Sequence, residues 1–453
     1  MKIDVLVAEI GSTTTVVNAF NGIDTDSPVF VGQGQSTTTI QGDGVTTGLK
    51  YAIDDLAKNL GVSDISYGDM LATSSAAGGL RMTVHGLVYD MTVRAAKEAA
   101  LGAGANLMLT TAGVLTKLDI EDIERIDPNL ILLAGGTDYG ERETALKNAE
   151  LLSELSVRPP IIYAGNVQNQ TAVKSILESA GFKCYLVENV YPRLDDLNIE
   201  PTRKIIHKVF EEHITKAKGM QHVREMIKGT IMPTPGAVME AAQLLYGEIE
   251  DVVVIDVGGA TTDVHSVTDG SEEITNMMIS PEPKAKRTVE GDLGLYVSAA
   301  NLIDLIGRDV FSRELGMDVD DILADYAPIP QNKIQLKLAQ RLAWYASKTA
   351  LERHAGRIRY IYGASGRKMY AEGKDLTKVK TLVATGGALT RMEGREEILL
   401  GLRDLNKNKL LLLPEPETMN VLQDRDYIMA SLGALSINYK EAALALIKQS
   451  LGI

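Results

Sequence analysis

Two segments far apart in the chain combine an acidic residue, glycine and hydroxyl side chains in the same order. The first is residues 6–16, with the sequence LVAEIGSTTTV, and the second is residues 254–264, with the sequence VIDVGGATTDV. In each segment an apolar run precedes the glycine, and a second apolar run begins after the hydroxyl residues. Short apolar runs bounded by glycine are typical of β-strands. Both segments therefore predict a β-hairpin with a turn made of glycine and hydroxyl residues.

Such turns can hold a phosphate group. Glycine lets backbone N–H groups approach a phosphate closely because no Cβ stands in the way, and Ser and Thr hydroxyls add further donors. The carboxylates of Glu9 and Asp256 cannot bind phosphate, so they would hold a cation or orient a water molecule. Mg²⁺ is bound by a few carboxylates and several retained waters, which suits one acidic residue from each hairpin. Two such hairpins facing each other would clamp a polyphosphate and its metal.

The alternative is that these are two ordinary hairpins with glycine-rich turns. A motif match of this kind occurs by chance, so either hairpin alone is weak evidence. The pair is stronger because the two segments share order and chemistry, and because a third glycine signal, residues 385–388 (TGGA), follows a predicted strand at 381–384. The set of three favours phosphate binding.

The rest of the chain predicts an α/β fold, because short apolar strands alternate with longer helical patterns along most of it. Between residues 129 and 190 the pattern is strand, helix, strand, helix and strand, which fits a small parallel sheet. We interpret 129–190 as an inserted subdomain. A further short strand is expected at 410–413, where Pro414 ends it.

One turn of this predicted subdomain, residues 135–140 (GGTDYG), lies between a strand and a helix. Phosphates can bind at such a place, at the N-terminus of the helix. Glycine in a strand-to-helix turn also serves packing, and recognition of a protein partner explains the turn equally well. All three interpretations stay open.

Composition restricts the possible partners. The chain has 453 residues, a single cysteine and a formal net charge of −14. Binding to nucleic acid or to an anionic membrane surface depends on Lys and Arg, so neither partner is expected. No apolar run reaches the roughly 18 residues of a membrane helix, and the N-terminal residues show no signal-peptide pattern. A cytoplasmic protein of about three domain-sized units is expected.

The two hairpins and the 386–387 turn resemble the two phosphate motifs and the adenosine motif of the superfamily that contains acetate and sugar kinases, heat-shock chaperones and actin. The resemblance implies a two-lobed, ribonuclease H-like fold around a nucleotide cleft. Residues 1–245 would form lobe I with the inserted subdomain, residues 246–425 would form lobe II, and residues 426–453 would be helices that return to lobe I.

A closer resemblance, spread over the whole chain, is to the MutL family associated with glutamate mutase. It rests on five segments: 10–14 (IGSTT), 75–80 (SAAGGL), 133–138 (LAGGTD), 289–294 (VEGDLG) and 353–357 (RHAGR). Members of that family are thought to be ATP-driven chaperones that reactivate adenosylcobalamin-dependent mutases. The resemblance therefore implies ATP and Mg²⁺ as ligands and a mutase subunit as the protein partner. A small-molecule kinase and a filament-forming actin relative are the alternatives, and the mutase served and the oligomeric state stay open.

The resemblance also implies roles for individual residues. Asp256, Asp263 and Glu9 would be the catalytic carboxylates. Asp256 would orient water or bind Mg²⁺ through water, Asp263 would lie near the same metal, and Glu9, from the other hairpin, would be a further Mg²⁺ ligand. ATP would be contacted by the following residues: Gly11, Ser12, Thr13, Thr14, Gly258, Gly259, Thr261, Thr262, Gly386 and Gly387. Glu9 departs from the superfamily, which usually has aspartate at that position. Hydrolysis is therefore expected to be slow or stimulated by the partner.

Two basic residues at the end of a predicted helix, Arg353 and His354, have two interpretations. They could edge the adenine pocket, where guanidinium stacking is favourable. A salt bridge at the helix end is favoured, because basic residues are common at helix C-termini.

Overall fold

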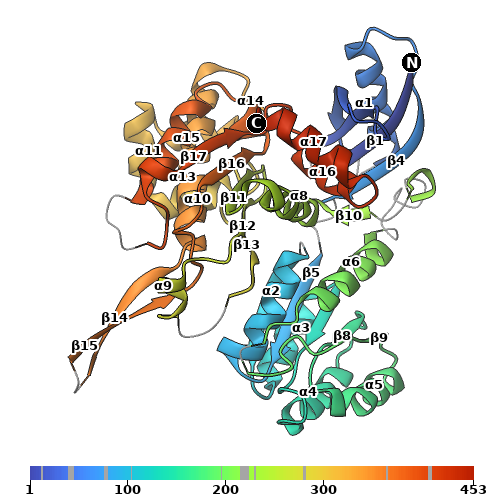
Figure 1. The fold of residues 1–453 in the computed structure, drawn as a ribbon, viewed down its shortest axis with the longest axis vertical. Helices are drawn as coiled ribbons and strands as arrows, with labels where there is room; N and C mark the ends of the chain where they lie inside the picture. The colour runs from blue at the N-terminus through green and yellow to red at the C-terminus, as the bar shows by residue number, and fades with distance from the viewer. Residues whose placement is uncertain are drawn as a thin grey trace. The chain divides into compact units, whose positions relative to one another are not determined.

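The chain folds into two compact units, residues Met1–Ala237 and Val238–Ile453. The structure is a computed structural model that describes residues 1–11, 14–38, 45–75, 80–103, 105–194, 196–214, 224–228, 231–278, 282–363, 366–406 and 411–453. Figure 1 shows the elements of both units, and each unit is described by itself below. The predicted division into lobes 1–245 and 246–425 with returning helices 426–453 remains a proposal.

The first sheet of unit 1 has five strands in the order β10-β4-β1-β2-β3. Its elements are β1 (Lys2–Ile10), β2 (Thr14–Asn21), β3 (Val29–Thr37), β4 (Ser66–Ser74) and β10 (Ile231–Pro233), with helix α1 (Val45–Asn59) packed beside β3. β1, β2 and β3 pair antiparallel, and β4 and β10 continue the sheet in parallel with β1. The hairpin predicted from residues 6–16 is confirmed as β1 and β2.

The second sheet of unit 1 is entirely parallel, with the order β6-β5-β7-β8-β9. Its strands are β5 (Arg81–Gly86), β6 (Asn106–Ala112), β7 (Leu130–Leu133), β8 (Ile161–Tyr163) and β9 (Cys184–Leu186). Its helices are α2 (Arg94–Gly102), α3 (Lys117–Ile126), α4 (Glu143–Ser153), α5 (Gln170–Ser179) and α6 (Glu200–Ile214). The strand and helix order predicted for 129–190 is confirmed, and the sheet also contains β5 and β6, which precede that range.

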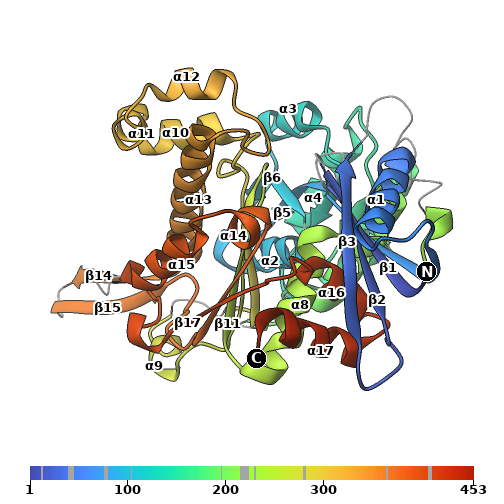
Figure 2. The same ribbon diagram turned by 90° about the horizontal axis from the view of Figure 1, so that it is seen from above.

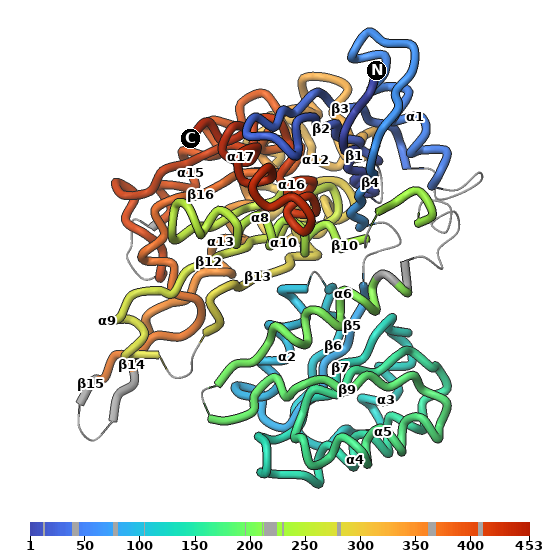
Figure 3. The backbone as a smooth tube through the Cα atoms, turned by 45° about the vertical axis from the view of Figure 1, so that its right-hand side comes forward, coloured from blue at the N-terminus to red at the C-terminus, as the bar shows by residue number. Residues whose placement is uncertain are grey.

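Both faces of this parallel sheet are covered by helices, as Figure 3 shows. Leu130 and Leu132 of β7 belong to a core that includes residues of α2 and α6. Ile131 and Leu133 belong to a second core, which includes residues of α3, α4 and α5. Every residue of β7 is therefore buried, as is usual for strands of parallel sheets.

The parallel sheet is inserted between two neighbouring strands of the first sheet. The chain leaves β4 at Ser74 and returns at Ile231, the first residue of β10. Ile231 lies opposite Ala72 of β4 in the register of the two strands. The points of entry and exit are therefore adjacent in the first sheet.

The sheet of unit 2 repeats the strand order of the first sheet. Its order is β13-β12-β11-β16-β17, with β11, β12 and β13 antiparallel and β16 and β17 parallel to β11. The strands are β11 (Val252–Val257), β12 (Thr262–Val267), β13 (Ala285–Glu290), β16 (Thr381–Thr385) and β17 (Asn420–Gln423). Two mixed sheets of this order are the ribonuclease H-like arrangement, so the predicted α/β fold class is confirmed.

Helices surround the sheet of unit 2. The long helix α13 (Lys333–His354) covers one face of it (Figure 2). The other helices are α8 (Thr234–Ile249), which spans the boundary between the units, α9 (Glu272–Thr275), α10 (Ala299–Ile306), α11 (Arg308–Leu315), α12 (Val319–Ala324), α14 (Gly387–Arg391), α15 (Arg395–Arg403), α16 (Met429–Ser436) and α17 (Lys440–Leu451). A separate hairpin consists of β14 (Arg357–Gly363) and β15 (Gly366–Glu372). Among the described residues, no helix has the length and apolar character that crossing a membrane requires.

The predicted strand at 410–413 is wrong. Residue 410 lies outside the described residues, and Leu411 makes only an isolated bridge with Arg357. The strand at the edge of the sheet is β17, seven residues beyond the end of the predicted one. Pro414 and Pro416 lack the N–H that a strand ladder needs, so the chain pairs with β16 only after it has passed them.

Candidate nucleotide-binding site

Asp256 lies near the end of β11, just before the second predicted hairpin turns. β11 and β12 pair antiparallel, with Asp256 opposite Asp263 and Val257 opposite Thr262. A hydrogen bond of 2.9 Å from the Gly258 N–H to the Thr261 carbonyl oxygen closes the turn. The hairpin predicted from residues 254–264 is therefore formed, and both aspartates lie on the same face of the sheet.

Residues 295–298 hold this turn in place by donating hydrogen bonds to the carbonyl oxygens of the turn. The Gly258 and Gly259 carbonyl oxygens accept hydrogen bonds of 2.8–3.1 Å from the N–H groups of residues 295–297. The Ala260 carbonyl oxygen accepts one of 3.1 Å from the Ser298 hydroxyl. The N–H groups of Gly259 and Ala260 donate to no acceptor within the described parts of the chain. The turn is thus fixed through its acceptors, which leaves backbone donors for an anion.

The 386–387 turn packs directly against the end of β11. β16 places Thr385 beside Asp256, and Gly386 follows with a φ of 88°, a conformation that side chains with a Cβ rarely adopt. A Cβ on Gly386 would lie 2.4 Å from the Val257 carbonyl oxygen and 2.8 Å from an Asp256 carboxylate oxygen. Only glycine allows this approach. At Gly387, in contrast, a Cβ would meet nothing within 4 Å.

The two aspartates of the hairpin have different surroundings. Asp256 is half-buried, whereas only 4% of Asp263 is exposed. Asp263 accepts a hydrogen bond of 2.7 Å from Nη2 of Arg287, on β13, and one of 3.2 Å from the Thr261 hydroxyl. Arg287 is fully buried, so the ion pair is shielded from water. Because a buried charge is stable only when paired, Arg287 fixes Asp263, and Asp263 in turn orients the hydroxyl of Thr261.

Thr262 projects from the opposite face of the hairpin. It is fully buried, and its hydroxyl donates to the Leu293 carbonyl oxygen at 2.8 Å. The β11 residues on that face, Ile255 and Val257, belong to the apolar core of unit 2. Any phosphate contact from Thr262 would therefore come from its main chain.

The basic residues at the end of α13 pair with the strand beside the hairpin. Nη1 of Arg353 lies 2.5 Å from a Glu290 carboxylate oxygen and 2.9 Å from one of Asp292, and Nη2 lies 3.0 Å from the other Asp292 oxygen. The bonds from Arg353 lower the pKa of Asp292, whereas burial raises the pKa of Glu290. The favoured interpretation of Arg353 as part of a salt bridge is therefore confirmed.

His354 is buried and lies between two hydroxyl groups. Its Nε2 is 2.8 Å from the Ser266 hydroxyl and its Nδ1 is 2.6 Å from the Thr288 hydroxyl. Burial holds the pKa of His354 well below the usual value, so the ring is neutral at pH 7. This arrangement gives His354 a packing role inside unit 2.

The first hairpin repeats the same turn in unit 1. The Gly11 N–H donates to the Thr14 carbonyl oxygen at 2.9 Å, which matches the bond that closes the second hairpin. A Cβ on Gly11 would lie 2.7 Å from that oxygen, so the turn requires glycine. Ser12 and Thr13 lie outside the described residues.

Glu9 lies two residues before this turn and is only 8% exposed. Its Oε1 accepts a hydrogen bond of 3.3 Å from the Asn18 side chain, whose own oxygen accepts one of 2.6 Å from the Gln33 side chain. The first sheet thus brings Glu9, Gly11 and Thr14 together, with the carboxylate held in a polar network. The sheet of unit 2 brings together Asp256, Asp263, the 258–261 turn and Gly386.

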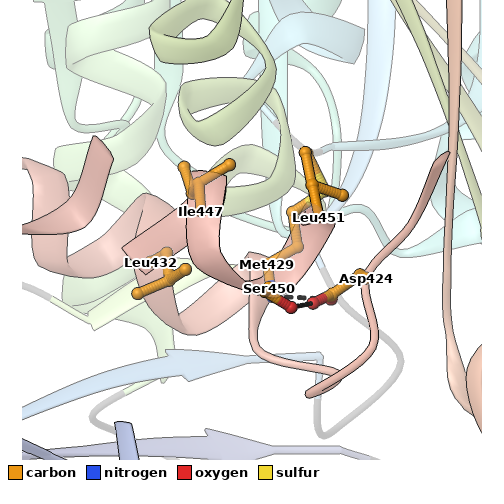
Figure 4. Close-up of a pocket in the computed structure, with 6 residues that line it drawn as sticks. All are labelled: Asp424, Met429, Leu432, Ile447, Ser450 and Leu451. Atoms are coloured by element: carbon orange, nitrogen blue, oxygen red, sulfur yellow. Dashed lines mark hydrogen bonds between the residues drawn. The ribbon is translucent and has the colours of Figure 1, made fainter. Parts of the chain in front are cut away.

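A small pocket in unit 2, which no residue of the hairpin lines, lies between the end of β17 and the last two helices (Figure 4). Its lining consists of Asp424, Met429, Leu432, Ile447, Ser450 and Leu451. Asp424 accepts hydrogen bonds from the hydroxyls of Ser450, at 2.6 Å, and Thr385, at 2.9 Å. Because its walls are otherwise apolar, this pocket is unsuited to a nucleotide. The Thr385 bond nevertheless fixes the end of β16 beside Asp256.

Sequence reasoning missed Arg287, although it is the buried partner of Asp263. Arg287 occurs in the segment AKRTVE, in which it follows another basic residue and precedes a threonine. This run has no apolar alternation that would indicate a strand with one buried face, so the sequence does not tell which polar side chain is buried. If the burial of Asp263 were known, a cationic partner could be inferred, but this burial is seen only in the structure.

The similarity to known proteins extends over almost the whole chain. The family model described as MutL protein matches residues 5–451. Protein MutL of Clostridium tetanomorphum is 36% identical over 462 residues, which cover 98% of both chains. Two solved structures are more distant: a nucleotide-free diol dehydratase-reactivating factor (TM-score 0.40, 11% identity, 97% of this chain and 100% of that chain) and a glycerol dehydratase reactivase (TM-score 0.38, 11% identity, 95% and 99%). The full-length match to the family model and to its relative shows that this chain belongs to the MutL protein family.

Proposed function

We propose that this protein binds and hydrolyses ATP and uses the cycle to reactivate an adenosylcobalamin-dependent amino acid mutase. One observation carries the nucleotide part of the proposal. The two sheets have the same strand order, and each contains one of the two hairpins. In each hairpin an acidic residue is followed by a turn that a hydrogen bond from a glycine N–H to a threonine carbonyl oxygen closes. A duplicated turn of this kind suits the two ends of a polyphosphate.

In the proposal, each turn would contact phosphate groups of ATP. Gly258, Gly259 and Thr261 would do so in unit 2, together with the main chain of Thr262. Gly11, Ser12, Thr13 and Thr14 would do so from the first hairpin. Gly386 and Gly387 would lie under the ribose and adenine, at the turn where Gly386 packs tightly against β11.

The residues near the second turn fit a magnesium ion. Mg²⁺ is usually bound through one or two carboxylates, retained waters and the substrate's phosphates, so it does not require a cluster of acidic residues. The half-buried Asp256 carboxylate would supply such a ligand through water, and Glu9 would supply the second. The ion would neutralise charge on the β- and γ-phosphates.

Hydrolysis requires a water molecule to attack the γ-phosphorus while the bond from that phosphorus to the bridging oxygen breaks, which gives ADP and phosphate. Asp256 would orient this water and accept its proton, because it is the half-buried carboxylate beside the turn. Asp263 is held by Arg287, so we assign it a positioning role, through the Thr261 hydroxyl. Glu9 in place of aspartate is consistent with slow turnover.

The partner part of the proposal rests on family membership and not on the site. ATP binding would favour one arrangement of the protein and hydrolysis another, and a ligand can shift such an equilibrium only by its different affinity for the two states. The mutase would be the partner that responds to the change between these two arrangements.

An Asp256→Asn variant tests the proposed catalytic group. Phosphate release should fall by about 100- to 10,000-fold, the usual contribution of one acid–base group, while binding of a fluorescent ATP analogue is retained. Asp251→Asn is the matched control, because Asp251 immediately precedes the same strand, and it should hydrolyse ATP at the wild-type rate. Phosphate release that persists in Asp256→Asn would remove the assigned role, and stimulation of wild-type hydrolysis by purified glutamate mutase would support the partner.

A further inference from the structure

The carboxyl edge of the parallel sheet in unit 1 presents an exposed apolar side chain after every strand. Because all five strands are parallel, their carboxyl ends and the loops that follow lie at one edge of the sheet. One such residue follows each strand, and each is 40–78% exposed. In the spatial order of the strands they are Val114 after β6, Tyr89 after β5, Tyr139 after β7, Val167 after β8 and Leu194 after β9. With strands about 4.8 Å apart, the five strand ends span about 20 Å, and the segment after β9 turns back toward the loop after β7, where the Asp138 N–H donates to the Pro192 carbonyl oxygen.

The amino edge of the same sheet lacks this feature. The segments that enter its strands are residues 75–80, 103–105, 127–129, 154–160 and 180–183, of which residues 76–79 and 104 are not described. None of their described residues is an exposed large hydrophobic side chain. Single exposed apolar residues need no explanation, but a row confined to one edge of a sheet does. Carboxyl edges are also where parallel α/β sheets bind their ligands.

Tyr139 occupies the middle of the row and has an unusual backbone. Its φ is 63°, which is uncommon for a bulky side chain and persists only where the surroundings enforce it. The fully buried Asn166 enforces it, because its side-chain oxygen accepts from the Tyr139 N–H at 3.2 Å and its side-chain NH₂ donates to the carbonyl oxygens of Gly140 and Glu141. Local strain therefore presents an exposed tyrosine at the centre of the edge.

Hydrogen bonds connect the loops on this side of Tyr139 into one surface. Oδ1 of Asp138 accepts from the Val167 N–H at 2.9 Å and from the Asn189 side chain at 3.0 Å. The Asp138 N–H donates to the Pro192 carbonyl oxygen at 3.0 Å. These polar groups bond to one another, and the apolar side chains point outward. A fixed apolar surface of this kind fits a protein better than a small polar ligand, which binds in concave pockets.

Charged residues beside the row are mainly acidic. Asp90, Glu141 and Glu188 are exposed in three of the five loops, and the basic Arg193 is exposed beside Leu194. Arg142, which follows Glu141, donates to the side chain of Asn169 at 3.0 Å. Charged rims steer association and select partners of opposite charge. The matching surface would therefore have an apolar centre, with Lys or Arg opposite the three acidic residues.

We infer that this carboxyl edge is the surface on which the partner enzyme docks, with Tyr139 as its central contact. The identity of the occupant as the mutase rests on the proposed function. The position of Tyr139 is that of a binding hot spot, which is typically an aromatic residue near the centre of an interface. The row of loops, and not the nucleotide site, thus determines which enzyme is recognised.

Binding of purified glutamate mutase to immobilised protein tests this inference. Tyr139→Asn removes the ring and keeps a residue that tolerates positive φ, so the loop should stay folded. The dissociation constant should rise about 30-fold, as expected for a hot spot, and Val167→Asp should weaken binding as well. Tyr51→Ala is the matched control, because Tyr51 lies on α1 and is also 56% exposed, and it should bind like the wild type.

Wild-type affinity in both Tyr139→Asn and Val167→Asp would overturn the docking surface. Basal phosphate release should be unchanged in these variants, so failure of docking is distinguishable from failure of the ATPase assignment, which Asp256→Asn tests separately. Absence of any binding by the wild type would overturn the mutase as the occupant. A dimer in sedimentation that Tyr139→Asn dissociates would overturn it too, in favour of a second copy of this chain.

Discussion

The buried ion pair between Arg287 and Asp263 allows a quantitative test of how unit 2 is held together. Replacing Arg287 by Met leaves Asp263 at 4% exposure without its cation. Removing one partner of a buried pair destabilises a protein by about 3–5 kcal/mol. For a unit of this size each kcal/mol lowers Tm by about 2–4 °C, so Arg287→Met should lower the Tm of unit 2 by roughly 6–20 °C. Replacing both residues, in Arg287→Met with Asp263→Leu, should restore stability to within about 1 kcal/mol of the wild type.

Urea unfolding followed by tryptophan fluorescence measures this effect directly. Trp344 is the only tryptophan of the chain, and it lies on α13, packed against the core of unit 2. Phosphate release should stay low in the double variant, because Thr261 has lost the carboxylate that orients its hydroxyl. A double variant as unstable as Arg287→Met alone would refute the account of the pair. Wild-type hydrolysis in a stable double variant would refute the positioning role of Asp263.

Two further predictions follow from the packing of glycine and histidine. Gly386→Ala should weaken binding of ATP and destabilise unit 2 by about 2–4 kcal/mol, because the added methyl is strained and overpacks β11, whereas Gly387→Ala should be near neutral in the same urea titration. Burial lowers the pKa of His85 to about 4, so folding excludes a proton that the unfolded chain binds below about pH 6.5. Stability should be complete above pH 6.5 and fall by about 3 kcal/mol as the pH drops to 4. Urea unfolding followed by circular dichroism should show this loss of unfolding free energy in the wild type and a smaller loss between pH 6.5 and 4 in His85→Gln. The same pH dependence in both proteins would contradict the prediction.

Local spacing was sufficient to predict the two hairpins and the order of elements in 129–190. The reason is physical: a Cβ on Gly11 would lie 2.7 Å from the carbonyl oxygen across the turn, which requires glycine, and a Cβ on Gly258 would lie 3.2 Å from the corresponding oxygen, which is a tight contact. Strand β7, with the sequence LILL, is buried on both faces, which leaves an unbroken apolar signal. Such constraints act within a few residues, so they can be read from the chain.

Features that depend on distant partners could not be read in this way. β5 has the sequence RMTVHG, and its His85 is buried because the hydroxyls of Thr83 and Thr111 lie at its ring nitrogens. Nothing in the local sequence shows that pairing, so this strand lacks the expected apolar pattern. β17 lies at a sheet edge and is partly exposed throughout. Arg287 is a charged residue, which usually lies at the surface, but it is buried here because its partner Asp263 lies on a neighbouring strand.

The adjacency of β4 and β10 has an evolutionary consequence. Because the chain departs from one strand and comes back on the next, with Ile231 opposite Ala72, the whole segment from β5 to α6 is a loop whose two ends meet. Segments of this type can be exchanged, enlarged or trimmed without altering the pairing of the parent sheet. Among related chains, the segment between β4 and β10 can therefore differ in length and sequence while the five strands of the first sheet keep their order.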